Sequence, residues 1–167
     1  YSSEPVVEEA YTGGRLLNIP SIQHYLQLQN TYIIATTQTG FLLVHQQFAH
    51  ERVLYEQYSL AVHSKQAPTQ KSLFPIPLEL AASDSVLLQE LLPDLQLIGY
   101  QIEKDEQHQF VIQGTPADII VGNEKHAIEM LIEQFKHFNS DINFSKKEKL
   151  VRCMAKQQSI KTGLTLD

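Results

Sequence analysis

The sequence predicts an α+β fold, on three observations. Of its 167 residues, 43% are hydrophobic and 19% are charged, a balance typical of a packed domain rather than a disordered tail. Segments with the period of strands and of helices occur in mixed order, without the regular rhythm of a parallel βαβ sheet. No segment repeats another, so a repeat architecture is excluded.

The charge and cysteine content of the chain indicate which partners and which cellular compartment to expect. The chain carries 13 Lys+Arg against 19 Asp+Glu, a net charge of −6, which argues against binding nucleic acid through bulk charge alone. The single cysteine, Cys153, excludes an internal disulfide and favours a reducing compartment. No apolar run approaches the ~20 residues that span a bilayer. We therefore expect a cytoplasmic domain with no membrane contact.

The first half of the chain divides into a linker and an uncharged block. Residues 1–15 carry three glutamates before Gly13-Gly14 and are expected to form a solvated linker. From Leu16 to His50 there is no Asp, Glu, Lys or Arg. A block of this kind lies either in the core of the fold or against a partner subunit.

Two strands and a helix are expected next. Thr31–Thr37 and Phe41–His45 are rich in apolar and β-branched residues, and Thr39-Gly40 between them supplies a turn, which predicts an antiparallel hairpin. A helix is expected over Phe48–Val62. Its buried face is expected to carry Ala49, Val53 and Leu60.

The middle of the chain alternates between extended and helical patterns. Leu73–Leu80 contains two prolines, which confine it to an edge strand. Ser83 is expected to cap a helix that Pro93 ends. Two strands, 98–104 and 109–113, follow around a polar loop, and Gly114–Ala117 is expected to turn the chain.

Two helices are expected to complete the fold. Asn123 can cap the first, and Ser145 the second, which reaches Thr162 with Gly163 just beyond its end. The first helix has an apolar stripe at a spacing of 3.6 residues, expected to lie in the core. That stripe consists of Ile128, Leu131, Ile132 and Phe135.

Several segments together resemble one known family. They are Ala-His-Glu-Arg-Val-Leu-Tyr-Glu at 49–56 within 30–56, Ile-Gly-Tyr-Gln-Ile-Glu at 98–103 followed by Phe-Val-Ile-Gln-Gly-Thr-Pro-Ala at 110–117, and Ile-Lys-Thr-Gly at 160–163. In this order and spacing they are similar to the C-terminal domain of the bacterial mismatch repair protein MutL, over about residues 18–166.

The resemblance implies a homodimerising domain of two lobes. A dimerisation lobe would contain residues 16–65 and 140–167, and an inserted regulatory lobe residues 66–139. The parent protein would carry an N-terminal ATPase that uses ATP and Mg²⁺, whereas this domain needs no cofactor. Implied partners are a second copy, the sliding clamp, other repair proteins such as MutS, and DNA, contacted weakly or through the parent.

Many members of that family are metal-dependent endonucleases, but the motif is degenerate here. His45 stands where the family has Asp, Gln47 where it has His, and Lys156 where it has a thiolate, while Glu51 and Glu56 are retained. A lysine opposes a cation site, so we expect no catalytic residue and no metal. The alternative is that His45, His50 and Glu51 still bind a metal ion, and that the domain is an endonuclease with atypical ligands.

The segment Gln70–Pro75 has the form of a peptide that binds a sliding clamp. Gln70 would hydrogen-bond at the rim of the clamp's pocket, and Leu73 and Phe74 would supply the buried anchors, with Pro75 ending the motif. It also lies where the family has a similar motif. The alternative is an ordinary edge strand with Leu73 and Phe74 in the core.

The last helix is basic in an otherwise acidic chain. Lys149, Arg152 and Lys156 share one face and could contact the DNA backbone, or they could form an ordinary solvated face.

Three hypotheses for the function thus remain: a non-catalytic dimerisation and docking domain of a mismatch repair protein, a metal endonuclease, and an unrelated α+β binding domain. The residues favour the first.

Overall fold

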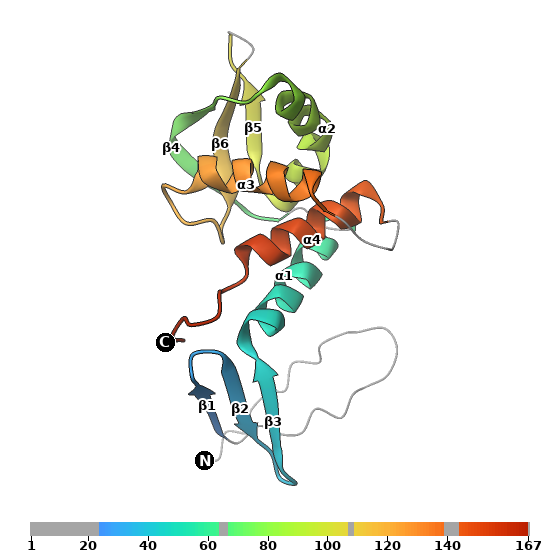
Figure 1. Ribbon diagram of the computed structural model, residues 1–167. Helices are drawn as coiled ribbons and strands as arrows, with labels where there is room; N and C mark the ends of the chain where they lie inside the picture. Colours follow the sequence, from blue (N-terminus) through green and yellow to red (C-terminus); the bar gives the residue numbers. More distant parts are fainter. Residues whose placement is uncertain (1–23, 64–66, 107–108, 139–143, 167) are drawn as a thin grey trace, which may run out of the picture.

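The computed structural model describes residues 24–63, 67–106, 109–138 and 144–166. Two antiparallel sheets lie at opposite ends of an elongated molecule, with helices α1 (Gln46–His63) and α4 (Lys146–Gln158) between them (Figure 1). The expected α+β class is confirmed. The linker expected over residues 1–15 lies outside the described residues.

The first sheet contains β1 (His24–Leu28), β2 (Tyr32–Thr36) and β3 (Phe41–His45), hydrogen-bonded in that order. The expected hairpin is confirmed as β2 and β3, whereas β1 was not predicted. A tight turn joins β1 to β2: Gln29 and Asn30 have φ of 50° and 47°, and the Thr31 N–H donates to the Leu28 carbonyl at 3.1 Å. Two successive positive φ values define a turn that matches the twist of a hairpin.

Helix α1 begins directly where β3 ends, but the face predicted for burial is wrong. Val53 and Leu60 are exposed, and the neighbouring row faces inward. Adjacent helical residues point about 100° apart, and packing of α1 against α4 selects the inner row. That row is Leu54, Tyr58, Ala61 and Val62.

The second sheet has the order β4-β6-β5, with β4 (Thr69–Leu78), β5 (Gln101–Lys104) and β6 (Phe110–Pro116). The prediction that the proline-containing segment is an edge strand is therefore confirmed. The turn expected at Gly114–Ala117 is wrong, because β6 continues through Pro116. Pairing of β4 with β6 is interrupted between Lys71 and Ile76.

Helix α2 (Ala82–Ile98) runs through Pro93, so the expected end at that residue is wrong, as is the expected cap, because Ala81 precedes the first turn. An internal proline costs about 3 kcal/mol. Each fully buried leucine or isoleucine stabilises the fold by roughly 1.5–3 kcal/mol, and the apolar row continues past the proline. The row consists of Leu88, Leu91, Leu95 and Ile98.

Gly99 ends α2 and explains why the following strand starts later than predicted. Its φ is 110°, and a Cβ atom there would lie 2.8 Å from the Pro68 carbonyl oxygen. Only glycine accepts both the left-handed backbone and this close approach. Ile98 therefore belongs to the helix, and β5 begins at Gln101.

The last two helices confirm the expectations in part: Asn123 precedes α3, but its side chain makes no capping hydrogen bond. In α3 (Glu124–Lys136) the predicted stripe is buried, which confirms it as core. Ser145 caps α4, since its Oγ accepts from the Glu148 N–H at 3.2 Å, although α4 ends at Gln158 rather than at Thr162. Side chains of all four helices and of the second sheet form one core. The predicted lobe boundaries fall outside the described residues, and the two-lobe division stays a prediction.

Candidate functional site

One side of the first sheet exposes a row of large apolar side chains. Leu26, Ile34 and Leu43 lie side by side across β1, β2 and β3, and Leu26 and Leu43 are 53% and 56% exposed. Leu28 and Phe41 lie two residues along their strands and so share this side. We call these five residues the open face.

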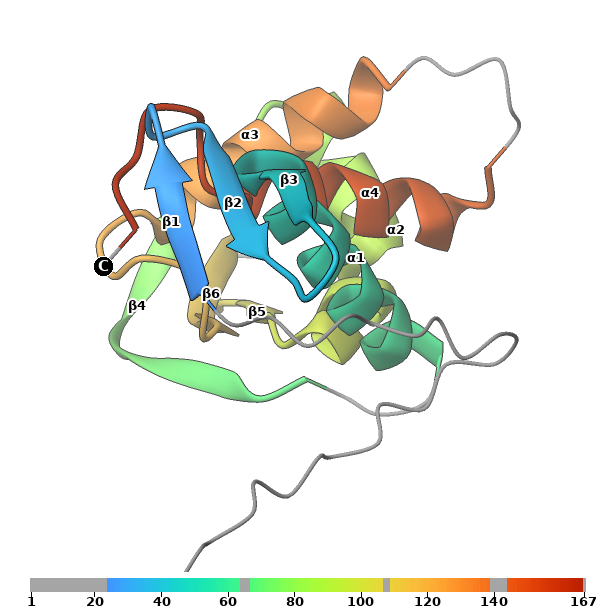
Figure 2. The same ribbon diagram turned by 90° about the horizontal axis from the view of Figure 1, so that it is seen from below.

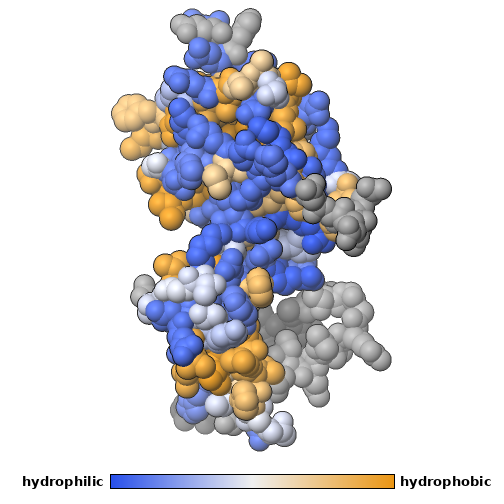
Figure 3. Space-filling model, viewed as in Figure 1, coloured by the Kyte–Doolittle hydropathy of each residue, from blue (hydrophilic) through white to orange (hydrophobic). Residues whose placement is uncertain are grey.

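The open face is uncharged and forms a continuous patch. Figure 3 shows apolar surface gathered over this end of the molecule, and residues 16–50 supply no charged side chain to interrupt it. Exposed apolar patches of this kind mark interaction surfaces. Of the two expectations for the uncharged block, burial in the chain's own core therefore does not hold for the open face among the described residues.

The segment after α4, residues 159–166, is hydrogen-bonded beside this sheet, in part through the buried side chain of Gln46. The Gln46 side chain is 1% exposed, and its Nε2 donates to the carbonyls of Asn30 and Leu164 at 2.8 and 3.0 Å. Its Oε1 accepts from Gln27 Nε2 at 2.6 Å, and the Gly163 N–H donates to the Asn30 carbonyl at 2.8 Å. Figure 2 shows the segment running alongside the sheet.

The degenerate endonuclease positions do not converge as a group. The ring of His45 lies 5.3 Å from that of Tyr32 and 4.3 Å from that of Phe48, between centroids, and its buried Nδ1 has no hydrogen-bond partner among the described residues. Gln47 Oε1 accepts from the Thr162 hydroxyl at 2.9 Å. Glu56 pairs with Arg52.

Only Glu51 and Lys156 come together, in a pocket between α1 and α4. Its volume is about 430 Å³. Around this one carboxylate stand the cations Arg52, Arg152 and Lys156, a donor set that fits an anion and not a divalent metal. The other lining residues are Phe48, Tyr55, Phe138, Phe144 and Ala155.

The alternative metal set is likewise not assembled. The Nδ1 of His50 accepts from the Ile160 N–H at 3.0 Å, and His45 is held in its aromatic stack. Within the described ranges, no group of three or more His, Cys, Asp or Glu residues is placed to hold a metal ion.

The basic face of α4 is partly engaged within the molecule. The Lys149 ammonium lies 4.3 Å from the centroid of the Phe135 ring, and Arg152 Nε donates to Glu148 at 2.7 Å. The hydroxyl of Tyr55 donates to the same carboxylate at 3.0 Å. Burial raises the pKa of Tyr55, the bond to Glu148 raises it further, and Arg152 opposes both.

The interrupted part of β4 presents the expected clamp-binding side chains to solvent. Leu73 and Phe74 are 94% and 78% exposed, so the alternative that places them in the core is wrong. Gln70, Leu73 and Phe74 line a hollow of about 420 Å³. Pro75 lies in the same unpaired stretch.

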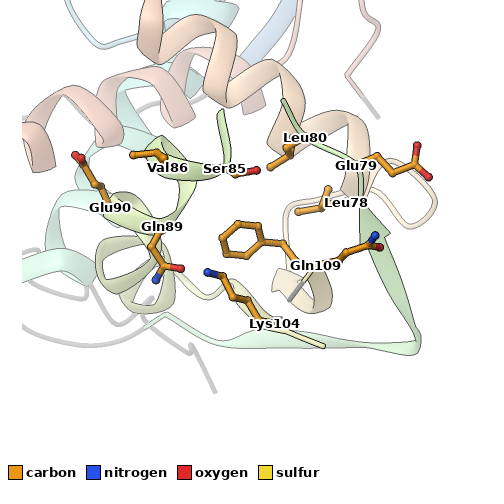
Figure 4. Close-up of a pocket in the computed structure, with 10 residues that line it drawn as sticks. Leu78, Glu79, Leu80, Ser85, Val86, Gln89, Glu90, Lys104 and Gln109 are labelled. Atoms are coloured by element: carbon orange, nitrogen blue, oxygen red, sulfur yellow. The ribbon is translucent and has the colours of Figure 1, made fainter. Parts of the chain in front are cut away.

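Another cavity, of about 740 Å³, lies between α2 and the second sheet. Leu78 and Phe110 are among its apolar lining residues, and the side chains of Lys104 and Gln89 point toward each other (Figure 4). Its polar rim mixes both charges, and Glu90 pairs with Lys146 at 2.7 Å. No single ligand chemistry is favoured by this lining.

Sequence reasoning missed two contributions to these surfaces. Strand β1 supplies Leu26 and Leu28 to the open face, for which the signal was the short alternation in His-Tyr-Leu-Gln-Leu at 24–28. Phe48, on α1, and Phe144, two residues before α4, reach one pocket from positions far apart in the sequence, and no local pattern predicts that meeting.

Comparisons with known proteins are consistent with this arrangement. A family model described as "MutL C terminal dimerisation domain" matches residues 25–166. The chain is 28% identical over 166 residues to the DNA mismatch repair protein MutL of Flavobacterium psychrophilum, covering 99% of this chain and 27% of the relative. It is 32% identical over 141 residues to MutL of Flavobacterium johnsoniae, covering 84% of this chain and 22% of the relative.

The chain thus spans about a quarter of the length of these relatives. None of the helices in the described ranges combines the length and apolar character needed to cross a bilayer.

Proposed function

We propose, for a chain that belongs to the family of MutL C-terminal dimerisation domains, that the open face is its homodimer interface. Family membership removes the hypothesis of an unrelated binding domain, and it does not favour an endonuclease. The observation that carries the proposal is the uncharged row around Leu26, Ile34 and Leu43, more than half exposed at its two outer leucines.

Physical chemistry supports this surface over the others. A three-stranded sheet needs one apolar face covered to be stable, and the open face lacks such cover in the described chain. A two-fold dimer places the same patch on both sides of the interface. Ile34, on the central strand, would then lie near the two-fold axis.

The dimer would act mechanically in the parent protein. Holding two copies together raises the effective concentration of whatever each copy is joined to. We infer that the joined parts are ATPase arms, which could close around DNA, and that the protein works in the cytoplasm with other mismatch repair proteins such as MutS. The parent, and not this domain, would bind ATP and Mg²⁺.

Sedimentation over a concentration series tests the interface. We expect a mass about twice 19.0 kDa, and a monomer for the double variant Leu26→Asp with Leu43→Asp, because paired carboxylates cannot be buried across a two-fold axis. Val86→Asp is the matched control, since Val86 is a similarly exposed apolar residue on α2. The proposal would be refuted if the unsubstituted chain were a monomer, or if the double variant were still a dimer.

We also propose that the unpaired stretch of β4 binds a sliding clamp. The specific support is the exposure of Leu73 and Phe74. These bulky apolar side chains can enter a partner's pocket without being pulled out of the core of this domain. Gln70 lies at the rim of the same hollow and could hydrogen-bond to a partner.

Titration against purified clamp tests this second proposal. Gln70→Ala with Leu73→Ala should weaken binding at least tenfold, since interface anchors typically contribute more than about 1–2 kcal/mol each. Val86→Ala should leave binding unchanged. Clamp binding that is the same in both variants would remove β4 from the contact.

A further inference from the structure

The pocket between α1 and α4 has the lining of a site for an anion that carries a flat ring. Its volume of about 430 Å³ lies within the range of about 300–1,000 Å³ found for ligand sites. None of its lining residues belongs to the open face, so it does not depend on the dimer. The residues that matter are Phe48, Glu51, Phe144, Arg152 and Lys156.

The charges of the pocket favour a phosphate. Arg52 and Arg152 have acidic partners, Glu56 and Glu148, whereas no acidic side chain in the described ranges lies within ion-pair distance of the Lys156 ammonium. The Arg52–Glu56 pair is exposed and contributes little. The Arg152–Glu148 bond uses the Nε of Arg152, and a guanidinium has further N–H donors to offer an incoming anion. Glu51 alone opposes the three cations.

The aromatic rings favour a base. Phe48 is 65% exposed, and its ring is held by stacking on His45 at 4.3 Å. Phe144 lies under the guanidinium of Arg152 at 4.4 Å. Phe48 is exposed and Phe144 is partly exposed. Single-stranded nucleic acids stack their bases on accessible rings beside cations, and each stacked base contributes about 1–3 kcal/mol.

We propose that this pocket binds a nucleotide, free or within a single strand, and holds it without a metal ion. The base stacks on Phe48 or Phe144, and the phosphate contacts Lys156 and Arg152. A single concave contact of this kind is compatible with the acidic net charge of −6, which disfavours a long duplex track. The lysine that opposes a metal at this position is thus the residue that recruits the phosphate.

The test is fluorescence anisotropy of a short labelled single-stranded oligonucleotide, at low salt with EDTA present. We expect Lys156→Gln and Phe48→Ala each to weaken binding by roughly fivefold or more. Glu51→Gln should strengthen binding, because it removes the opposing charge. Lys147→Gln is the matched control on the same helix, since Lys147 lies 3.5 Å from Asp94 and outside the pocket. Circular dichroism checks that each variant is folded.

Competition identifies the ligand. An unlabelled deoxynucleoside monophosphate that displaces the strand would show that one nucleotide suffices, and failure of the monophosphate alone would assign the site to strands; both support the proposal. Equal weakening by Lys147→Gln would reduce binding to general charge and overturn it. Equal affinity for a duplex, or equal competition by an oligoglutamate peptide, would also overturn it, because neither offers an unstacked base.

Discussion

The sheets β1–β2–β3 and β4–β6–β5 are both three-stranded and antiparallel, but their apolar sides meet different surroundings. In the second sheet Ile102 and Ile112 are completely buried within the core formed with the helices. In the first sheet the equivalent side chains, Leu26 and Leu43, are more than half exposed.

The strands themselves do not account for this difference. Both sheets are made of alternating or continuous apolar strands, and both contain a two- or three-residue apolar row across their strands. What differs is which elements follow in the chain: α2 and α3 pack on the second sheet, whereas α1 leaves the first sheet end-on (Figure 1). An apolar sheet can thus serve as core or as interface according to its connections.

The largest expected effect comes from the covered sheet. Ile112→Ala should lower the free energy of unfolding by about 2–5 kcal/mol, because it leaves a cavity in a fully packed site. Urea denaturation at several protein concentrations measures this. The loss should be the same at every concentration; a loss that appears only in the dimer would contradict the assignment of Ile112 to the monomer core.

A substitution in the open face should weaken the dimer and leave the stability of the monomer almost unchanged. Leu43→Ala should raise the Kd of the dimer roughly 30- to 700-fold, because each copy loses one buried side chain, together about 2–4 kcal/mol. The stability of the dilute monomer should change by less than about 0.5 kcal/mol. Leu60→Ala is the control at a similarly exposed position on α1 and should leave Kd unchanged. Sedimentation measures both.

A smaller effect is expected at the glutamine that fastens the C-terminal segment. Gln46→Ala should cost about 1–3 kcal/mol, because it removes a buried side chain that makes three hydrogen bonds, to Gln27, Asn30 and Leu164. The neighbouring variant Gln47→Ala, which loses one partly exposed bond to Thr162, should cost less than about 0.5 kcal/mol. Thermal unfolding compares the two; equal costs would show that the buried network contributes nothing special.

The smallest effect at neutral pH concerns Cys153, on the helix that joins the two regions. Burial raises the pKa of its thiol from 9.0 to about 11, with Lys149 and Lys156 opposing the shift. Because the folded state favours the protonated thiol, its contribution to stability is complete below pH 9 and is lost as the pH rises through 11. Alkylation, followed by mass spectrometry, should be slow at pH 8 and accelerate about tenfold per pH unit. Rapid alkylation at pH 8 would contradict this burial.

The sequence predicted those features that have a local cause. The β2–β3 hairpin, the serine cap of α4 and the apolar stripe of α3 each depend on neighbouring residues, and the structure confirms them. Strand β1 was missed because its turn uses Gln29 and Asn30 rather than the usual Asn-Gly pair. Pro93 was misread because the stabilising contacts of α2 come from the core and not from the helix itself.

The sites show the same division. The exposure of Leu73 and Phe74 could not be predicted, because it depends on a break in pairing between β4 and β6. The degenerate motif was visible residue by residue, but the meeting of Glu51 with Lys156 and three phenylalanines requires α1 and α4 to pack together. The loss of a catalytic motif can be predicted from the residues alone, whereas the site that replaces it can be recognised only in the folded structure.

The direct passage from β3 into α1 makes the first sheet and the first helix one stiff lever. The helix has 18 residues, which at a rise of about 1.5 Å per residue gives an arm of about 27 Å. A tilt of about 5° where two copies meet would therefore displace the far end of the arm by about 2 Å. Helix α1 packs against α2 and α4. A change in the angle between two copies would therefore shift these helices, at the opposite end of the molecule from the open face.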